Sequence, residues 1–379
     1  MSEKVQNAPQ GITPATKGMR LLICTQAVDL EDPYLGFFHR WLEEFSKYTE
    51  SLEVVALRVG KHNLPQNVRA HSLGGAPRGA PPRGFARLMY RLRIALRFLS
   101  LVWQLRGRYD AVFVHMNPEY AVLGGPVWRA LRKKVVLWYV HRAVSLYLRL
   151  AIFWAHIVFS AAPESFRVRT NKVRFVGNAV DSAFAQLGAR RTPRRSLSAP
   201  LHLVVVGRVS PIKRLDVLIR ALALARQQGV NAQLAIIGGP VTDADREYAH
   251  KLTELAREQG VEDYVVFEGP VAPSSMPLRL VSADIALNAS PSGGVDKAGL
   301  EALASGLPLV ASNTGYLSLF GEQPWLLMAD DERAFAEHIV QLARLTPEQL
   351  ADLGRAAQAT VARKVSLETL VCTITTALA

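Results

Sequence analysis

Cysteine is scarce in this sequence, and several motifs that mark common enzyme classes are missing. Of its 379 residues only Cys24 and Cys372 are cysteines, which excludes a disulfide framework and a four-cysteine zinc site. A chain with so few thiols fits a reducing compartment. No H-E-x-x-H motif and no cysteine–histidine cluster occurs, so we predict no metal site and no metal cofactor.

The common phosphate-binding loops and long apolar runs are also missing. No G-x-G-x-x-G follows a predicted strand and no G-x-x-x-x-G-K-[ST] occurs, which argues against a nicotinamide dehydrogenase and a P-loop NTPase. The nearest apolar run, residues 150–163, is too short to span a bilayer and suits a core helix that leads into a buried strand. Residues 1–18 lack an apolar core and include Glu3, so we expect a flexible polar tail rather than a secretory signal.

Charge is unevenly distributed along the chain. The whole chain has a net charge of +13, but residues 1–180 hold 26 lysines and arginines against 11 acidic residues, a net charge of +15. The remainder holds 19 basic and 21 acidic residues and is close to neutral. This asymmetry predicts an anionic partner that only the first half contacts.

Strand-like and helix-like segments alternate along both halves of the chain, which is typical of parallel α/β sheets. The predicted strands are residues 20–25, 53–57, 111–115, 135–140, 202–206, 232–237, 265–267, 285–288 and 308–311. The predicted helices are residues 34–48, 85–106, 121–133, 213–228, 243–260, 297–304, 331–344 and 347–363.

A polar, basic segment, residues 186–200, separates the two halves. We therefore predict two Rossmann-like domains, at 19–185 and 201–379, that face each other across a cleft. The last helix either stays with the second domain or crosses back to the first. Ligands of such sheets bind at the carboxyl ends of the strands.

Two cations follow the first predicted strand of the second domain. Arg208 comes directly after that strand, and Lys213 opens the next helix. A guanidinium and an ammonium at this edge suit a diphosphate, because one offers a fork of donors and the other a point charge. The alternative is a pair of solvated surface cations, although a cation at a helix start opposes the helix dipole.

A Ser-Gly-Gly turn in residues 290–306 leads directly into a predicted helix, and backbone N–H groups at such a junction form an anion site. Glu301 lies about one turn into this helix, in an otherwise apolar segment. A mostly buried acid needs a partner, which is either a pair of sugar hydroxyls or an internal arginine.

A series of short motifs runs through the second half in a fixed order: Gly207-Arg208, Lys213-Arg214-x-Asp216, Ile237-Gly238, Val266-Phe267-x-Gly269, Ala283-Asp284, and LEALASGLP at 300–308. The series resembles the second domain of retaining GT-B glycosyltransferases, most of all glycosyltransferase family four (glycosyl transferases group 1), over residues 200–315. Residues 23–41 and 138–145 resemble the first domain of bacterial members more loosely.

The resemblance implies roles for particular residues. Arg208 and Lys213 would hold the donor diphosphate and act in catalysis, and Glu301, the second acid of the family's E-x7-E pattern, would contact the nucleotide ribose. The first acid of that pattern is absent, because Gly293 stands at its position; Asp296 is the nearest replacement carboxylate and equally suits a helix N-cap. The expected donor-binding set also includes Gly238, Val271, Gly293, Gly294, Asp296 and Lys297.

Histidines follow two consecutive strands of the first domain. The family places a histidine after a similar strand, next to the donor sugar, and His141 matches that position; we predict that it is catalytic. His115 ends the preceding strand. The expected acceptor-side residues are Leu35, Gly36, His39 and His115.

The predicted helix 85–106 carries a basic face. At 100° per residue, an apolar stripe (Phe85, Leu88, Met89, Leu92, Leu96, Leu99, Trp103) is predicted to face the core. The opposite arc is predicted to bind anionic lipid and holds Arg83, Arg87, Arg91, Arg93, Arg97 and Phe98. A solvated basic face packed on a neighbouring loop is the alternative. We predict no nucleic-acid partner, since no nucleic-acid module is visible.

We therefore expect a retaining, metal-independent hexosyltransferase that moves a sugar from a nucleotide-diphosphate donor to a lipid-linked or polysaccharide-precursor acceptor in cell-surface glycan biosynthesis. Its expected place is the cytosolic face of the inner membrane, peripherally bound. Two rivals stay open: a sugar-nucleotide epimerase of the same fold, and a non-catalytic protein that kept the nucleotide pocket.

Overall fold

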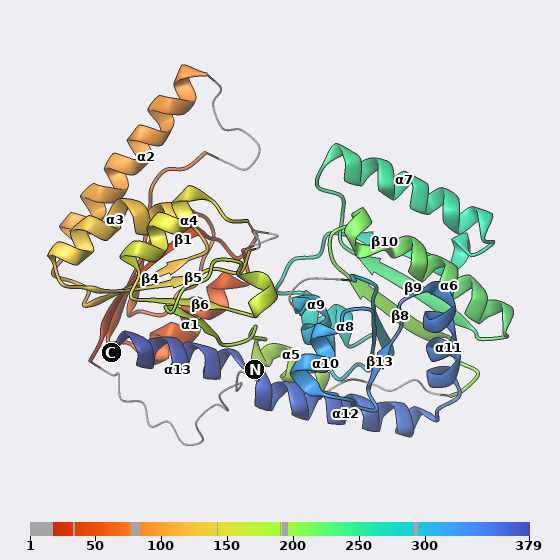
Figure 1. The fold of residues 1–379 in the computed structure, drawn as a ribbon. Coiled ribbons are helices and arrows are strands. Elements are labelled where there is room, and N and C mark those ends of the chain that lie inside the picture. Colours follow the sequence, from red (N-terminus) through yellow and green to blue (C-terminus); the bar gives the residue numbers. More distant parts are fainter. Residues whose placement is uncertain are drawn as a thin grey trace.

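Two parallel sheets lie side by side, each with helices on both faces (Figure 1). The computed structural model describes residues 18–32, 35–76, 84–141, 143–189, 191, 196–291 and 295–379. Alternating strands and helices give each domain a Rossmann-like arrangement, as the sequence pattern predicts.

The first sheet has the order β3-β2-β1-β4-β5-β6-β7. Its strands carry apolar side chains on both faces: Leu21 and Ile23 of β1 enter one core, and Leu22 and Cys24 enter the other. The strands are β1 (Arg20–Val28), β2 (Ser51–Val59), β3 (Val68–Ser72), β4 (Ala111–His115), β5 (Lys134–Trp138), β6 (Ile157–Ser160) and β7 (Val173–Phe175).

Helices cover both faces of this first sheet. One face packs against α1 (Phe38–Lys47) and α13 (Leu367–Leu378). The other packs against α2 (Phe85–Gln104), α3 (Pro118–Ala130) and α4 (Leu146–Trp154). The apolar run 150–163 is thus divided between α4 and β6. Within the described ranges, no helix combines the length and the apolar character needed to cross a bilayer.

The second sheet has the order β10-β9-β8-β11-β12-β13. Its strands are β8 (Leu201–Val206), β9 (Ala232–Ile237), β10 (Val265–Gly269), β11 (Ile285–Asn288), β12 (Leu309–Ala311) and β13 (Leu326–Met328). One face packs against α6 (Leu215–Gln227), α7 (Asp243–Glu258) and α11 (Glu332–Ala343). The other packs against α5 (Ser182–Gly188), α8 (Met276–Leu280), α9 (Lys297–Ala304), α10 (Gly315–Phe320) and α12 (Pro347–Lys364).

The chain passes twice between the domains, at two points that lie side by side. Val180 N–H donates to Val365 O at 2.8 Å, and Leu367 N–H donates to Val180 O at 3.1 Å. Phe184 of α5 is buried in the core of the second domain, so the boundary lies a few residues before the predicted position of 185. The last predicted helix, residues 347–363, corresponds to α12 and stays with the second domain. A further helix that was not predicted, α13, crosses back and packs in the core of the first domain.

The predicted orientation of α2 is wrong. Six of the seven side chains expected in the core are between 48% and 76% exposed: Phe85, Leu88, Met89, Leu92, Leu96 and Trp103. Phe98, expected on the lipid-binding face, is fully buried, and its ring centroid lies 5.0 Å from that of Tyr120. Apolar residues surround most of this helix, so their spacing alone does not tell which stripe meets the core. Arg83 lies outside the described residues.

Candidate functional site

Three glycines bring the ends of β8, β9 and β10 close together. Gly238 has φ +139°, and a Cβ there would come within 1.9 Å of Gly207 O, so only glycine fits at this position. Gly238 N–H donates to Gly269 O at 2.9 Å, and Gly207 N–H donates to Ile237 O at 2.9 Å. The carboxyl edge of the sheet is therefore bare backbone here, and a ligand can approach it closely.

Arg208 and Lys213 stand at this glycine edge. Arg208 is exposed and, within the described part of the chain, forms no ion pair. Lys213 ends a 3₁₀ turn, Pro211–Lys213, and Arg214 then adopts a left-handed conformation (φ 48°, ψ 44°) that starts α6. The Lys213 side chain packs close to Gly207, and a Cβ at Gly207 would lie 3.3 Å from Lys213 Nζ. Both cations thus lie at the carboxyl end of β8, as the sequence predicts.

Asp296 connects Lys213 to α9. Its Oδ2 forms an ion pair with Lys213 Nζ and accepts a hydrogen bond from Asn288 Nδ2 at 3.1 Å. Its Oδ1 accepts the Ala298 N–H at 3.3 Å, so Asp296 is also the N-cap of α9. Tyr316 Oη donates to the Asp296 carbonyl oxygen at 2.9 Å. These contacts hold the ammonium of Lys213 in front of the first turn of α9.

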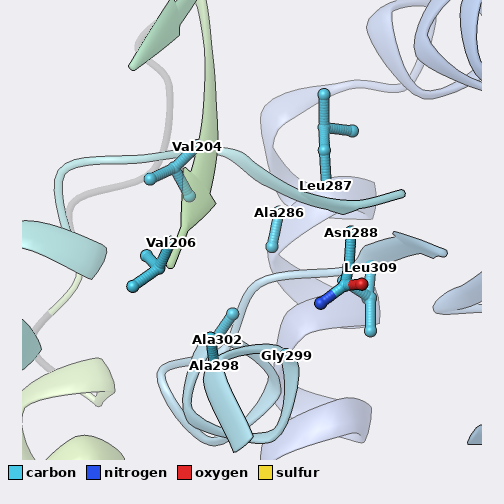
Figure 2. A pocket seen from close by; sticks show the side chains of 9 residues that line it. All are labelled: Val204, Val206, Ala286, Leu287, Asn288, Ala298, Gly299, Ala302 and Leu309. Carbon is cyan, nitrogen blue, oxygen red and sulfur yellow. The ribbon is translucent and has the colours of Figure 1, made fainter. Parts of the chain in front are cut away.

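Small side chains let α9 lie close to the sheet beneath this network. Figure 2 shows Ala298, Gly299 and Ala302 of α9 facing β8 and β11. The cavity between them has a volume of about 10 Å³. A Cβ at Gly299 would come within 2.0 Å of Tyr316 Oη. Gly299 therefore leaves room for the hydroxyl that holds Asp296.

Glu301 and Lys297 form the next pair along α9. The Glu301 side chain is 15% exposed, and its Oε1 lies 3.3 Å from Lys297 Nζ. Burial raises the pKa of Glu301, and the Lys297 ammonium opposes that shift. Lys297 Nζ also lies 3.9 Å above the centroid of the Phe37 ring, which belongs to the first domain. Within the described residues, no arginine forms an ion pair with Glu301, so its carboxylate can still accept a hydrogen bond from a ligand.

Further contacts hold the first domain against this part of the second. Arg40 Nε donates to Asp181 Oδ2 at 2.7 Å, and Asn178 Nδ2 donates to Val295 O at 2.8 Å. A Cβ at Gly36 would come within 2.7 Å of Asp32 O and 3.3 Å of Pro273 Cγ, so Gly36 lets the two domains approach. Leu35 is partly buried beside it, and its N–H donates to Asp32 Oδ1 at 2.9 Å.

His141 is exposed just after β5, at the carboxyl edge of the first sheet. The Ala143 N–H donates to its Nδ1 at 2.9 Å, so the proton of the neutral ring is on Nε2. Its ring centroid lies 6.3 Å from that of Tyr139. The side chain is therefore oriented by the backbone, with one donor left for a ligand.

The structure does not support acceptor contacts for His39 and His115, because both are only 2% exposed. His39 Nε2 accepts the Asn63 N–H at 3.1 Å, and its Nδ1 lies 2.9 Å from Glu43 Oε1. His115 stacks on Phe38 at 4.0 Å between ring centroids, and burial lowers the pKa of His115 to about 3. Both rings are core side chains, and a strand-end position alone does not distinguish them from His141.

The other predicted donor-binding residues fall in two groups. Val271 follows β10 by two residues and packs against the core of the second domain. Gly293 and Gly294 lie outside the described residues. Among the residues that are described, no three histidine, cysteine or acidic side chains gather in a way that could hold a metal ion.

Three further residues, not predicted from the sequence, shape the site: Asn288, Tyr316 and Phe37. Asn288 is buried at the carboxyl end of β11, and a polar side chain that ends an apolar strand is a usable signal. Tyr316 and Phe37 come from distant segments, so nothing local points to them.

Comparison with known proteins points to glycosyltransferases. Residues 200–344 match the family model described as glycosyl transferases group 1. The chain is 34% identical over 202 residues to D-inositol 3-phosphate glycosyltransferase 2 of Catenulispora acidiphila, covering 51% of this chain and 47% of that protein. It is 38% identical over 153 residues to D-inositol 3-phosphate glycosyltransferase of Actinosynnema mirum, covering 38% of this chain and 36% of that protein. The chain thus spans about half or less of the length of these curated relatives.

Solved structures match nearly the whole chain. Anabaena HepE in complex with UDP and glucose gives a TM-score of 0.68 at 18% identity, covering 95% of this chain and 99% of that one. Sucrose-phosphate synthase from Thermosynechococcus elongatus gives 0.67 at 17% identity, covering 94% and 97%. At such low sequence identities these matches show that both domains share the fold of the solved structures, and no more.

Proposed function

We propose that this chain, which has the GT-B fold and matches the glycosyl transferases group 1 model over residues 200–344, is a glycosyltransferase that takes its sugar from a nucleotide-diphosphate donor. One observation carries this proposal: Arg208 and Lys213 stand at a bare backbone edge in front of the first turn of α9. Two cations and a helix N-terminus suit a diphosphate. The neighbouring structures that hold UDP, UDP with glucose and UDP-glucose support the same class of donor.

In the proposed reaction the bond between the anomeric carbon and the diphosphate oxygen breaks. A new bond forms between that carbon and an acceptor hydroxyl, whose proton is released. Negative charge builds on the departing diphosphate, and Arg208 and Lys213 stabilise it without reorganising. His141 Nε2–H is the proposed donor to the transferred sugar, and retention of configuration follows the resemblance to retaining members.

The acceptor class is part of the proposal. The net charge of +15 in residues 1–180 suits an anionic, lipid-linked or polysaccharide-precursor acceptor for cell-surface glycan synthesis. The proposed location is the cytosolic face of the inner membrane, with the protein bound peripherally. The similarity to inositol-phosphate glycosyltransferases also favours an acceptor that carries a phosphate.

Incubation with labelled nucleotide sugars tests the reaction. A panel of donors is first screened by thermal shift, since a ligand that binds only the folded state raises its stability. A glycosyltransferase is expected to hydrolyse the best donor slowly, to consume it faster when an acceptor is added, and to form no epimer. Epimer formation identifies an epimerase, and binding without turnover identifies a non-catalytic protein; each contradicts the proposal.

Replacing Glu301 by alanine is expected to weaken UDP binding about tenfold, or ~1.4 kcal/mol, because the ribose diol loses its acceptor. Isothermal titration of the variant with UDP measures the effect. Glu254→Ala on the exposed face of α7 is the matched control and should leave affinity unchanged. A lower melting temperature with unchanged UDP affinity identifies Glu301 as a structural acid.

Transfer activity is expected to survive EDTA, since two protein cations supply the charge that a divalent metal otherwise provides. The test is a rate measurement before and after chelation and gel filtration. Loss of activity that Mg²⁺ or Mn²⁺ restores contradicts this expectation.

A further inference from the structure

A stripe of large apolar side chains on α2 faces away from the protein. The six exposed residues identified above range from Met89 at 48% to Phe85 at 76%. At 100° per residue they fall within about 100° of the helix circumference. Phe98 and Val102, which lie about 90–130° around the helix from the middle of the stripe, are buried. Figure 1 shows α2 projecting from the first domain at its N-terminal end.

Exposed arginines lie beyond both edges of the stripe. At 100° per residue Arg93 is about 40° and Arg97 about 80° beyond one edge, and Arg91 is about 60° beyond the other. Arg87 is exposed nearby, and within the described residues no carboxylate forms an ion pair with any of these four. Arg93 Nη2 donates to Gly74 O at 3.1 Å, which holds its guanidinium beside the helix. Cations that flank an apolar stripe are typical of helices that lie in a bilayer interface.

A second apolar face lies on α4. Leu146, Tyr147, Leu150 and Phe153 are between 41% and 71% exposed and share one side of this helix, with Arg149 exposed among them. Both helices lie on the same face of the first sheet, with α3 between them (Figure 1). The start of α4 is five residues after His141, so this face extends toward the candidate site.

Segments of this chain do not have the composition to cover these faces. Residues 1–17 hold only Met1, Val5 and Ile12 as large apolar residues, and residues 77–83 hold none. A monomer in water rarely exposes ten large apolar side chains on one side. The occupant must therefore be apolar and carry negative charge that complements the arginines.

We propose that α2 and α4 form a membrane-docking surface, in which their exposed apolar side chains insert shallowly into a bilayer and the flanking arginines contact anionic headgroups. The surface does not depend on the proposed transfer reaction. It differs from the surface predicted from sequence, because Phe98 holds α2 to the core while the stripe from Phe85 to Trp103 enters the lipid. A bilayer at this surface places His141 on the membrane side of the protein.

Sedimentation with vesicles tests the surface. The protein is expected to bind vesicles with roughly one third phosphatidylglycerol at least about tenfold better than pure phosphatidylcholine, and more weakly as salt rises. Leu92→Ser/Leu96→Ser should lower binding at least about tenfold, and Arg87→Gln/Arg91→Gln/Arg93→Gln should remove the preference for anionic lipid. Leu278→Ser is the matched control, since Leu278 is 58% exposed on α8 of the second domain.

Tryptophan quenching reports insertion directly. Trp103 is 54% exposed and Trp154 of α4 is partly buried, whereas Trp41, Trp128, Trp138 and Trp325 are at most 5% exposed. Bromine on the lipid chains should therefore quench part of the fluorescence. Trp103→Phe should lower that quenching without releasing the protein, and Trp103→Phe/Trp154→Phe should abolish it. Quenching that is unchanged in Trp103→Phe, or that persists in Trp103→Phe/Trp154→Phe, places the contact elsewhere and overturns the proposal.

Other outcomes contradict the proposal and are separable from the proposed function. Equal binding of Leu92→Ser/Leu96→Ser and wild type removes α2 from the surface. A concentration-dependent dimer that the same variant dissociates, together with no vesicle binding, identifies a second copy as the occupant. UDP thermal shifts without vesicles show whether each variant is folded and whether the donor site is intact, independently of the lipid result.

Discussion

Alanine at either Arg208 or Lys213 is expected to lower turnover at least about tenfold, and alanine at both about a hundredfold or more. The two cations act on charge that develops as the diphosphate departs, so their removal should reduce kcat more than it raises KM for the donor. Lys213→Ala leaves Asp296 with Asn288 and the Ala298 N–H, so the fold of α9 should persist.

Arg220→Ala is the matched control for this prediction. Arg220 lies on α6, seven residues after Lys213, and pairs with Asp216 at 3.0 Å on the surface. Its removal changes the net charge by the same amount and should leave turnover within about twofold. Near-normal turnover in both Arg208→Ala and Lys213→Ala would remove the central assignment of the donor diphosphate.

Phe98→Ala is expected to lower the free energy of unfolding of the first domain by about 3–5 kcal/mol, the usual cost of deleting a buried aromatic ring. Phe98 is fully buried between Tyr120 and Trp128, whose ring centroids lie 5.0 Å and 6.1 Å from its own. Urea unfolding followed by tryptophan fluorescence measures the loss, since Trp128 reports this core directly.

Leu96→Ala on the same helix supplies the comparison. Leu96 is 58% exposed, so its truncation should change stability by roughly 0.5 kcal/mol or less. A larger loss for Leu96→Ala than for Phe98→Ala would mean that α2 faces the sheet with its other side. That result would also remove the apolar stripe from the surface and with it the proposed docking site.

Most of the fold can be predicted from the sequence because Rossmann-like domains alternate elements whose ends are marked by polar and breaking residues. β9, β11 and α9 have the predicted bounds, and α7 ends two residues before the predicted position. Asp296, predicted as a possible N-cap, is the cap, and its pairing with Lys213 joins two segments that local pattern cannot connect. The short elements β3 and α10 were not predicted because few residues carry their periodicity, and α13, although 12 residues long, was not predicted either.

The errors concern which side of an element faces the core. On α2 the apolar residues extend around the helix, so the contact with Tyr120 and Trp128 selects the buried side. His115 and His141 both follow strands of one sheet, but Phe38 of α1 covers the first and leaves the second exposed. Such choices depend on neighbouring elements, and the sequence of one segment does not contain them.

The return of α13 to the first domain has a consequence for synthesis on the ribosome. Leu367, Val371 and Ile374 of α13 fill the core beside α1, and each is at most 4% exposed. The first domain therefore emerges early but lacks part of its core until the last helix has left the exit tunnel. The second domain, whose elements from β8 to α12 are consecutive, can close its own core before that moment. The domain translated first is thus the one completed last.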